Sequence, residues 1–283
     1  MRILLIGCRG MLGSELLVSL RAGHEVTGKD INELDITSAA DCRRIIEENC
    51  PDVVINAAAY TDVDGCEAER EKCFAVNAVG IKNVSLACQG KNIRIVHFGT
   101  DYVFDGKKDG PYHENDACGP LNAYGQSKLA GEKFLFELSD NFLLVRTAWL
   151  YGERGKNFVR NILEKVKTVR QLDVVDDQVG CPTYAVDLAC AVKGLVEDGH
   201  RGLFHVTNGG CCSWYEFAQA ILEYAGITEA DVRPIKSDEL KRSATRPCYS
   251  VLEGEKYSRV TGITMRPWRM ALRDCLEKIN SRC

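Results

Sequence analysis

Tyr124 and Lys128 are residues whose types and spacing suit proton transfer. They stand four positions apart in a segment predicted to be helical, so both side chains project from one helix face. A nearby ammonium group lowers the pKa of a phenol, which makes the phenol a better proton donor near neutral pH. Such pairs are also common on exposed helices, so their meaning depends on the elements around them.

Thr100 is a third candidate, in the segment Phe98-Gly-Thr-Asp-Tyr-Val-Phe104. It follows a predicted strand, Ile93–Phe98, and open α/β sheets bind ligands at the carboxyl ends of their strands. A hydroxyl at that place can hydrogen-bond a substrate carbonyl and a catalytic phenol. The alternative is that Thr100 is an ordinary strand-end or turn residue.

A glycine-rich turn, Gly7-Cys-Arg-Gly-Met-Leu-Gly13, lies between a predicted strand, Arg2–Ile6, and a predicted helix, Leu12–Arg21. Backbone N–H groups of such a turn can approach a pyrophosphate, whose charge the helix N-terminus stabilises. The spacing G-x-x-G-x-x-G departs from the usual G-x-G-x-x-G, and glycines at a tight turn can serve packing alone. The position after the first strand favours dinucleotide binding.

Asp30 follows the second predicted strand, Glu25–Lys29. A carboxylate there can accept hydrogen bonds from the adenosine ribose hydroxyls, which favours NADH. Arg9 and Lys29 could instead pair with a 2′-phosphate and favour NADPH, or they could be plain surface charges. The sequence therefore predicts NADPH or NADH as cofactor and leaves the choice between them open.

Strand-like runs alternate with helical segments through the first half of the chain, which is the pattern of a parallel sheet covered on both faces. Further helices are predicted at Asp41–Asn49, Arg70–Gln89, Ala123–Leu138 and Asp187–Glu197, and further strands at Asp52–Ala57, Phe142–Arg146 and Leu203–Val206. The predicted fold class is α/β, a Rossmann-type doubly wound parallel sheet with a smaller C-terminal substrate-binding lobe. Residues 1–150 with about 185–206 would form the NAD(P)-binding domain, and residues 151–184 and 207–283 the lobe.

Composition excludes several classes of function. The 283 residues have a formal net charge of −4 and no basic stripe, which argues against nucleic acid as a partner. No apolar run approaches the roughly 20 residues that span a bilayer, and the N-terminus lacks a signal-peptide pattern. We therefore expect a cytoplasmic protein without membrane contact.

The 14 cysteines show no zinc-type spacing, so no metal is predicted from them. In a cytoplasmic protein they are expected to be reduced structural thiols. The adjacent pair Cys211-Cys212 is the one expected to be most open to oxidation.

Taken together, the motifs resemble the extended short-chain dehydrogenase/reductase family, and within it the dTDP-4-dehydrorhamnose reductases. The resemblance covers nearly the whole chain and includes Leu34–Thr37, Asn56–Asp64, Thr100–Phe104, Leu121–Glu132, Arg146–Gly152, Asn157-Phe158, Asp177–Thr183 and Arg246-Pro247. It implies reduction of the C4 keto group of a dTDP-4-keto sugar, with hydride from the nicotinamide. Which 4-keto sugar is used does not follow from these motifs.

The resemblance also implies roles for single residues. Tyr124 would be the general acid, Lys128 would hold the nicotinamide ribose, and Thr100 would bind the substrate oxygen. Residues expected against the cofactor are Gly7, Arg9, Gly10, Met11, Leu12, Gly13, Asp30, Asp35, Ile36, Ala57, Ala58 and Ala59, besides Tyr124 and Lys128. Residues expected against the sugar nucleotide are Thr61, Val63, Thr100, Asp101, Tyr102 and Trp149, with core packing as the alternative for Trp149.

The chain departs from the family pattern at several positions. Gly99 stands where a serine is often seen, and Met11 where a glutamine is frequent. Some bacterial members form a dimer bridged by Mg²⁺ through glutamates. Glu15 matches one such position, but Asp187 and Arg269 stand at others, so we predict no metal and expect either a monomer or a homodimer.

Two other classes of function stay open. Dehydratases of the family usually carry Thr-Asp-Glu where this chain has Thr100-Asp101-Tyr102, so the base for water loss is missing. Another sugar-nucleotide reductase or epimerase, or a non-catalytic nucleotide-binding regulatory subunit, would share the same fold. Turnover of a keto sugar with NAD(P)H separates an enzyme from a regulatory subunit.

Overall fold

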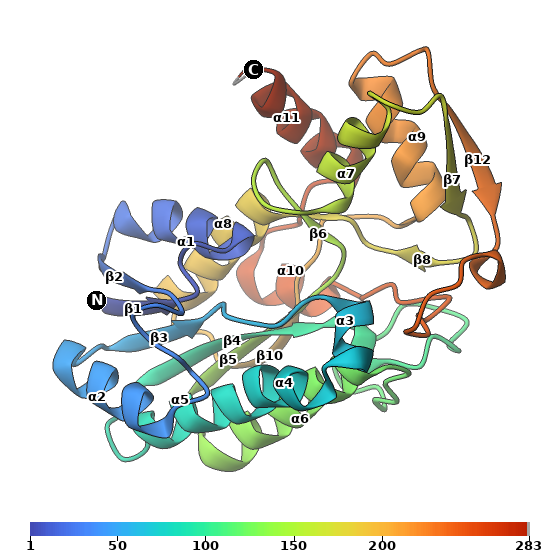
Figure 1. Ribbon diagram of the computed structural model, residues 1–283. Coiled ribbons are helices and arrows are strands. Elements are labelled where there is room, and N and C mark those ends of the chain that lie inside the picture. Colours follow the sequence, from blue (N-terminus) through green and yellow to red (C-terminus); the bar gives the residue numbers. More distant parts are fainter. Residues whose placement is uncertain (282–283) are drawn as a thin grey trace.

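A parallel sheet of six strands, in the order β10-β5-β4-β3-β1-β2, forms the centre of the larger part of the molecule (Figure 1). The structure is a computed structural model that describes residues 1–281. The strands are β1 (Arg2–Ile6), β2 (Glu25–Lys29), β3 (Val53–Asn56), β4 (Arg94–Thr100), β5 (Phe142–Thr147) and β10 (Gly202–His205). The predicted α/β class with a Rossmann-type parallel sheet is confirmed.

Helices cover both faces of this sheet (Figure 1). One layer contains α1 (Met11–Arg21) and α8 (Ala185–Glu197), and the other contains α2 (Ala39–Asn49), α4 (Arg70–Phe74), α5 (Gly80–Cys88) and α6 (Ala123–Leu138). Because side chains alternate along a strand, Ile3 and Leu5 of β1 pack in the first layer while Leu4 and Ile6 pack in the second. A strand covered on both faces must be apolar throughout, which is why these runs were recognisable in the sequence.

The segment predicted as one helix, Arg70–Gln89, is divided in the structure. Between α4 and α5 it forms a π-helical turn, Ala75–Val79. Asn77 in this turn is buried, and its amide oxygen accepts the backbone N–H of Tyr60 at 2.8 Å while its Nδ2 donates to the Tyr60 carbonyl at 3.0 Å. The prediction of an uninterrupted α-helix was wrong, because the i→i+5 hydrogen bonds of this turn interrupt the α-helical pattern where the polar side chain of Asn77 is buried.

A smaller lobe has its own apolar core, in which Phe217, Ile221 and Leu272 are fully buried. Its elements are β6 (Leu150–Tyr151), α7 (Phe158–Lys165), β7 (Gln171–Val175), β8 (Val179–Gly180), β9 (Thr183–Tyr184), β11 (Cys212–Ser213), α9 (Trp214–Tyr224), β12 (Asp231–Ile235) and α11 (Trp268–Asn280). The strands form the pairs β6-β9, β7-β12 and β8-β11. Figure 1 shows this lobe beside the sheet at the end where β4 and β5 finish.

The boundaries between the predicted NAD(P)-binding domain and the predicted lobe stay a prediction. Helix α10 (Glu255–Thr261), which the sequence reasoning assigned to the lobe, contributes Tyr257 to the core of the sheet. The remaining elements are three short helical segments: α3 (Val63–Ala68), η2 (Asp101–Val103) and η3 (Ser237–Glu239).

A buried ion pair joins α6 to β5. Arg146 Nη2 lies 2.7 Å from Glu132 Oε2, and the two side chains are 3% and 0% exposed. Arg146 Nε donates to both carboxylate oxygens, at 3.1 and 3.2 Å, so the contact is forked and directional. Two charges removed from water stabilise a fold only when each satisfies the other, so neither can be lost alone.

We expect Glu132→Gln to lower the free energy of unfolding by about 3–5 kcal/mol, because it leaves the buried Arg146 guanidinium without a counter-charge. Urea unfolding followed by circular dichroism measures this. The control is Glu164→Gln, which removes an exposed partner of Lys167 and should cost no more than about 1 kcal/mol. Equal losses in the two variants would contradict the importance of the buried pair.

Candidate active site

A cavity of about 570 Å³ opens at the carboxyl ends of β1, β3, β4 and β5. Fourteen of the residues predicted from the sequence line it: Gly10, Met11, Leu12, Gly13, Ala57, Ala59, Thr61, Val63, Thr100, Asp101, Tyr102, Tyr124, Lys128 and Trp149. They come from segments far apart in the chain, and the parallel strands bring them together because each strand ends at the same edge.

Six predicted cofactor residues lie outside this lining. The carboxylate of Asp30 accepts the backbone N–H groups of Arg9 at 2.8 Å and Ile31 at 2.9 Å. The Arg9 guanidinium pairs with Glu33 at the surface. Gly7 lies at the base of the glycine turn with a φ of +77°. The cofactor roles of these residues stay predictions.

The remaining residues of that set have structural contacts of their own. Asp35 Oδ1 accepts both the backbone N–H and the hydroxyl of Thr37, at 2.9 and 2.8 Å. Ile36 is buried in the core beneath the sheet, and Ala58 packs against the same core. The cofactor roles of Asp35, Ile36 and Ala58 stay predictions.

Two glycines of the turn before α1, Gly7 and Gly13, have no room for a side chain. A Cβ atom on Gly13 would lie 2.0 Å from the Gly7 carbonyl oxygen, and one on Gly7 would lie 2.7 Å from the backbone nitrogen of Ala58. Packing within the protein therefore requires glycine at both positions. Gly10 and Gly13 line the cavity, with the N-terminus of an 11-residue helix behind them, so backbone N–H groups of the turn can face a ligand there. This cradle fits the pyrophosphate of a dinucleotide.

Helix α6 places Tyr124 and Lys128 in the cavity. Its first turn is fixed by Asn122, whose side-chain oxygen accepts the backbone N–H of Gly125 at 2.8 Å. From its other side, Ser127 accepts a hydrogen bond from Asn77 in the π-helical turn at 3.0 Å. The π-helical turn thereby sets the position of the helix that carries both candidate residues.

Burial dominates the electrostatics of the pair. It lowers the pKa of Lys128 to about 8, against the opposing effect of Glu132 one turn away. Burial also raises the pKa of the Tyr124 phenol, while a hydrogen bond with Thr100 lowers it. The sequence-based expectation of a lowered phenol pKa was wrong here, because desolvation of the phenolate is the largest effect on its pKa and the charge of Asp101 acts in the same direction.

The cavity also contains residues that the sequence reasoning missed. Trp214 at the start of α9 lies parallel to Trp149, with ring centroids 3.5 Å apart and an angle of 4° between the planes. Ser213 and Glu216 form a capping box at the start of this helix, so the Ser-x-x-Glu pattern could have located the helix. Nothing local indicated that Trp214 faces the cavity. Gly155 and Lys156 also line it.

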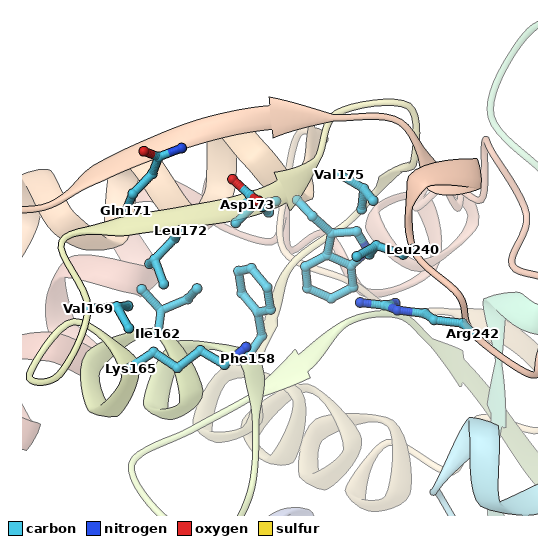
Figure 2. Close-up of a pocket in the computed structure, with 12 residues that line it drawn as sticks. Phe158, Ile162, Lys165, Val169, Gln171, Leu172, Asp173, Val175, Leu240 and Arg242 are labelled. Carbon is cyan, nitrogen blue, oxygen red and sulfur yellow. The ribbon is translucent and has the colours of Figure 1, made fainter.

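A second cavity, of about 460 Å³, lies in the lobe between α7, β7 and the loop after η3. Its lining is mostly apolar, with Phe158, Ile162 and Leu172 (Figure 2). Figure 2 shows Arg242 at the end opposite to Val169. Trp214 belongs to both cavities, so its indole is part of the wall between them.

Residues 1–281 contain no cluster of three His, Cys, Asp or Glu side chains that could hold a metal ion. Asp187, one of the positions compared with the metal-bridged dimer, forms an ion pair with Arg266 at 2.8 Å. Arg269, at another of these positions, lies over the Trp268 ring.

The thirteen cysteines of the described residues are free thiols, with Cys211 exposed and Cys212 buried, while Cys283 lies outside those residues. In the same part of the chain, none of the helices has the length and apolar character needed to cross a membrane.

The family described as "RmlD substrate binding domain" matches residues 1–281. The chain belongs to the RmlD family. A dTDP-4-dehydrorhamnose reductase of Mycobacterium tuberculosis is 40% identical over 97% of this chain and 92% of that protein. A dTDP-4-keto-6-deoxy-D-glucose reductase of Streptomyces niveus is 38% identical over 99% of this chain and 98% of that protein.

Solved structures agree with the RmlD assignment. A dTDP-4-dehydrorhamnose reductase of Clostridium acetobutylicum superposes with a TM-score of 0.95 at 40% identity, over 99% of this chain and 100% of that chain. A dTDP-4-dehydrorhamnose reductase of Bacillus anthracis, solved in complex with NADP, has a TM-score of 0.94 at 36% identity, over 98% and 99% of the two chains. The resemblance noted in the sequence is confirmed.

The structure of this RmlD protein explains why position 99 is a glycine. A Cβ atom there would lie 2.4 Å from Glu132 Oε1 and 2.7 Å from Arg146 Cγ. The buried ion pair thus occupies the space that a serine side chain would need.

We expect Gly99→Ala to lower the free energy of unfolding by about 1–3 kcal/mol, since the added methyl group must displace a buried, hydrogen-bonded pair. Chemical unfolding measures the loss. In Gly110→Ala, where a Cβ would meet no heavy atom within 4 Å, the change should stay within about 0.5 kcal/mol. A Gly99→Ala protein as stable as the Gly110→Ala control would show that the ion pair moves freely.

Proposed function

We propose that this protein reduces the C4 keto group of dTDP-4-dehydro-L-rhamnose to give dTDP-L-rhamnose, with NADPH or NADH as the hydride donor. The observation that carries the proposal is one cavity that is lined by Thr100, Tyr124 and Lys128 together with the glycine turn at the N-terminus of α1. The names of relatives that match along almost the full chain support the choice of sugar nucleotide.

In this mechanism the bound nicotinamide supplies the hydride, and the protein supplies orientation and a proton. The Thr100 hydroxyl binds the ketone oxygen, and the Tyr124 phenol donates its proton to that oxygen as negative charge develops. Lys128 stabilises this charge, and its pKa of about 8 keeps it largely protonated near neutral pH. Thr100 and Lys128 are buried, and the low water content around them keeps these interactions strong.

The second cavity suits the nucleoside end of the substrate. Its apolar wall with Phe158 can pack against a planar base, and Trp214 lines both this cavity and the one that would hold the sugar. Arg242, at the edge of this cavity, can pair with a diphosphate between the two ends. A sugar nucleotide would then lie across the indole wall, with its ketone toward Tyr124.

The alternative substrate is a different 4-keto sugar nucleotide. One relative supports it, since that protein is named a dTDP-4-keto-6-deoxy-D-glucose reductase. Dehydration is disfavoured, since the base position holds Tyr102, whose ring meets Tyr124 edge-on at 5.9 Å. A regulatory subunit without activity would oxidise no NADPH.

The partners and location complete the proposal. We expect NADPH to be the preferred hydride donor, because the related Bacillus anthracis structure is a complex with NADP. We expect the protein to work in the cytoplasm as a monomer or homodimer, without nucleic acid or membrane contact. Gel filtration with light scattering measures the oligomeric state, and parallel assays with the two nicotinamides measure the preference.

Tyr124→Phe should lower kcat by about 10²–10⁴-fold, because it removes the proton donor and keeps the ring. The assay mixes the protein with dTDP-4-keto-6-deoxyglucose, a 3,5-epimerase and NADPH, and follows loss of nicotinamide absorbance with dTDP-rhamnose as product. Tyr60→Phe is the matched control, since that phenol bonds Glu69 at the surface and should be dispensable. Unchanged turnover in Tyr124→Phe would remove Tyr124 from the mechanism.

Arg242→Ala should raise KM for the sugar nucleotide about 10-fold or more and leave KM for NADPH nearly unchanged. The reason is loss of a charge-assisted hydrogen bond worth about 1.5–3 kcal/mol. The neighbouring Lys241→Ala serves as control, because it removes an exposed cation that does not line the second cavity. Equal KM values for the two variants would place the diphosphate elsewhere.

A further inference from the structure

Asp101 lines the cavity, and only 2% of the surface of this residue is exposed. The hydroxyl of Ser250 contacts Oδ2 at 2.6 Å, and the hydroxyl of Thr100 contacts Oδ1 at 3.1 Å. Within residues 1–281 this carboxyl group forms no ion pair, unlike Glu132 and Asp64, which lie against arginines. An unpaired carboxyl group in such a place favours its neutral, protonated form.

The energetics agree with this geometry. Burial raises the pKa of Asp101 to about 7, while the two hydroxyls and the backbone N–H groups of Asp101 and Tyr102 act in the opposite direction. Near neutral pH the group therefore exchanges a proton readily. A carboxyl group held at the surface would be fully ionised at that pH.

The titratable groups around Asp101 come from four segments. Tyr124 projects from α6, Tyr102 belongs to the η2 turn, and Cys181 lies between β8 and β9; the charge of Asp101 raises the pKa of each. Arg242 and Arg246 from the C-terminal segment act on Tyr102 and lower its pKa. An ionised Asp101 would thus oppose loss of the Tyr124 proton, whereas a neutral Asp101 permits it.

We propose that Asp101 is the proton reservoir of the active site, and that it restores the proton of Tyr124 through the hydroxyl of Thr100. After Tyr124 has protonated the substrate oxygen, the Asp101 O–H bond breaks and its proton passes to Thr100 Oγ1. Thr100 gives up its own hydroxyl proton to the phenolate. The products are a neutral Tyr124, an unchanged Thr100 and an Asp101 carboxylate.

The surrounding groups suit both states of this step. The Ser250 hydroxyl and the two backbone N–H groups stabilise the carboxylate that forms. Asp101 lines the cavity, so water can return the proton once product leaves. Asp101 acts through Thr100 and does not itself touch the substrate oxygen. The relay rests on the proposed reductase function.

The test measures kcat at saturating substrate against pH for the wild type, Asp101→Asn and Ser250→Ala, with dTDP-4-keto-6-deoxyglucose, the epimerase and NADPH, because restoring the Tyr124 proton is a step of turnover after the chemistry. Because the protonated acid is the active form, the wild-type rate should fall as the pH rises through the pKa of Asp101. A second fall at higher pH, from Lys128, should persist in all three proteins. Circular dichroism and NADPH fluorescence verify that each variant folds and binds the cofactor.

Asp101→Asn keeps the size of the side chain but has no carboxyl proton to give, so kcat should fall about 10²-fold and lose the first, lower-pH decline. Ser250→Ala removes a donor to the carboxylate, so that decline should move upward by about one pH unit. A purely structural carboxylate would leave the position of the decline unchanged.

The relay is wrong if Ser250→Ala leaves the lower-pH decline where it is, or if folded Asp101→Asn retains it. If Asp101→Asn does not fold, the pH profile of Ser250→Ala alone decides whether the relay is correct. Wild-type protein that oxidises no NADPH contradicts the proposed reductase function and the relay together. Wild-type protein that turns over, with variants that follow its pH profile, contradicts the relay alone.

Discussion

The forked contact between Glu132 and Arg146 is the constraint from which the geometry of the candidate site follows. It connects α6 to β5 where no water competes, so the helix cannot slide or rotate without exposing two unpaired charges to an apolar interior. Lys128 lies one turn before Glu132, and Gly99 lies against the pair on β4. Strand, helix and the two candidate groups of the helix are thereby fixed relative to one another.

Desolvation then gives the polar groups of the cavity their chemical character. The same burial lowers the pKa of an ammonium group, raises that of a carboxyl group and raises that of a phenol. As a result Lys128 and Asp101 both titrate within about a unit of neutrality, although their ordinary pKa values lie far apart. The site acquires groups that gain and lose protons at physiological pH without a histidine.

Much of the fold follows from local sequence, because strands buried on both faces must be apolar and helix α6 begins at a recognisable cap, Asn122. Strand ends at one sheet edge then predict most of the cavity lining. Local pattern could not reveal the π-helical turn at Asn77, since its residues suit an α-helix equally well. It could not place Trp214 against Trp149, because that contact joins positions far apart in the chain. Nor could it give the pKa of Tyr124, which depends on the surrounding protein.

Trp214 lines both cavities and stacks on Trp149, so side chains form part of the boundary between the two cavities. Such a partition can be remodelled by exchanging one ring, while the sheet, the ion pair and the proton-handling groups stay as they are. Under the proposed function, the fold thus separates the evolution of ligand choice from the evolution of chemistry, because exchange of a ring could change the sugar or base that is accepted while Tyr124 and Lys128 keep their positions.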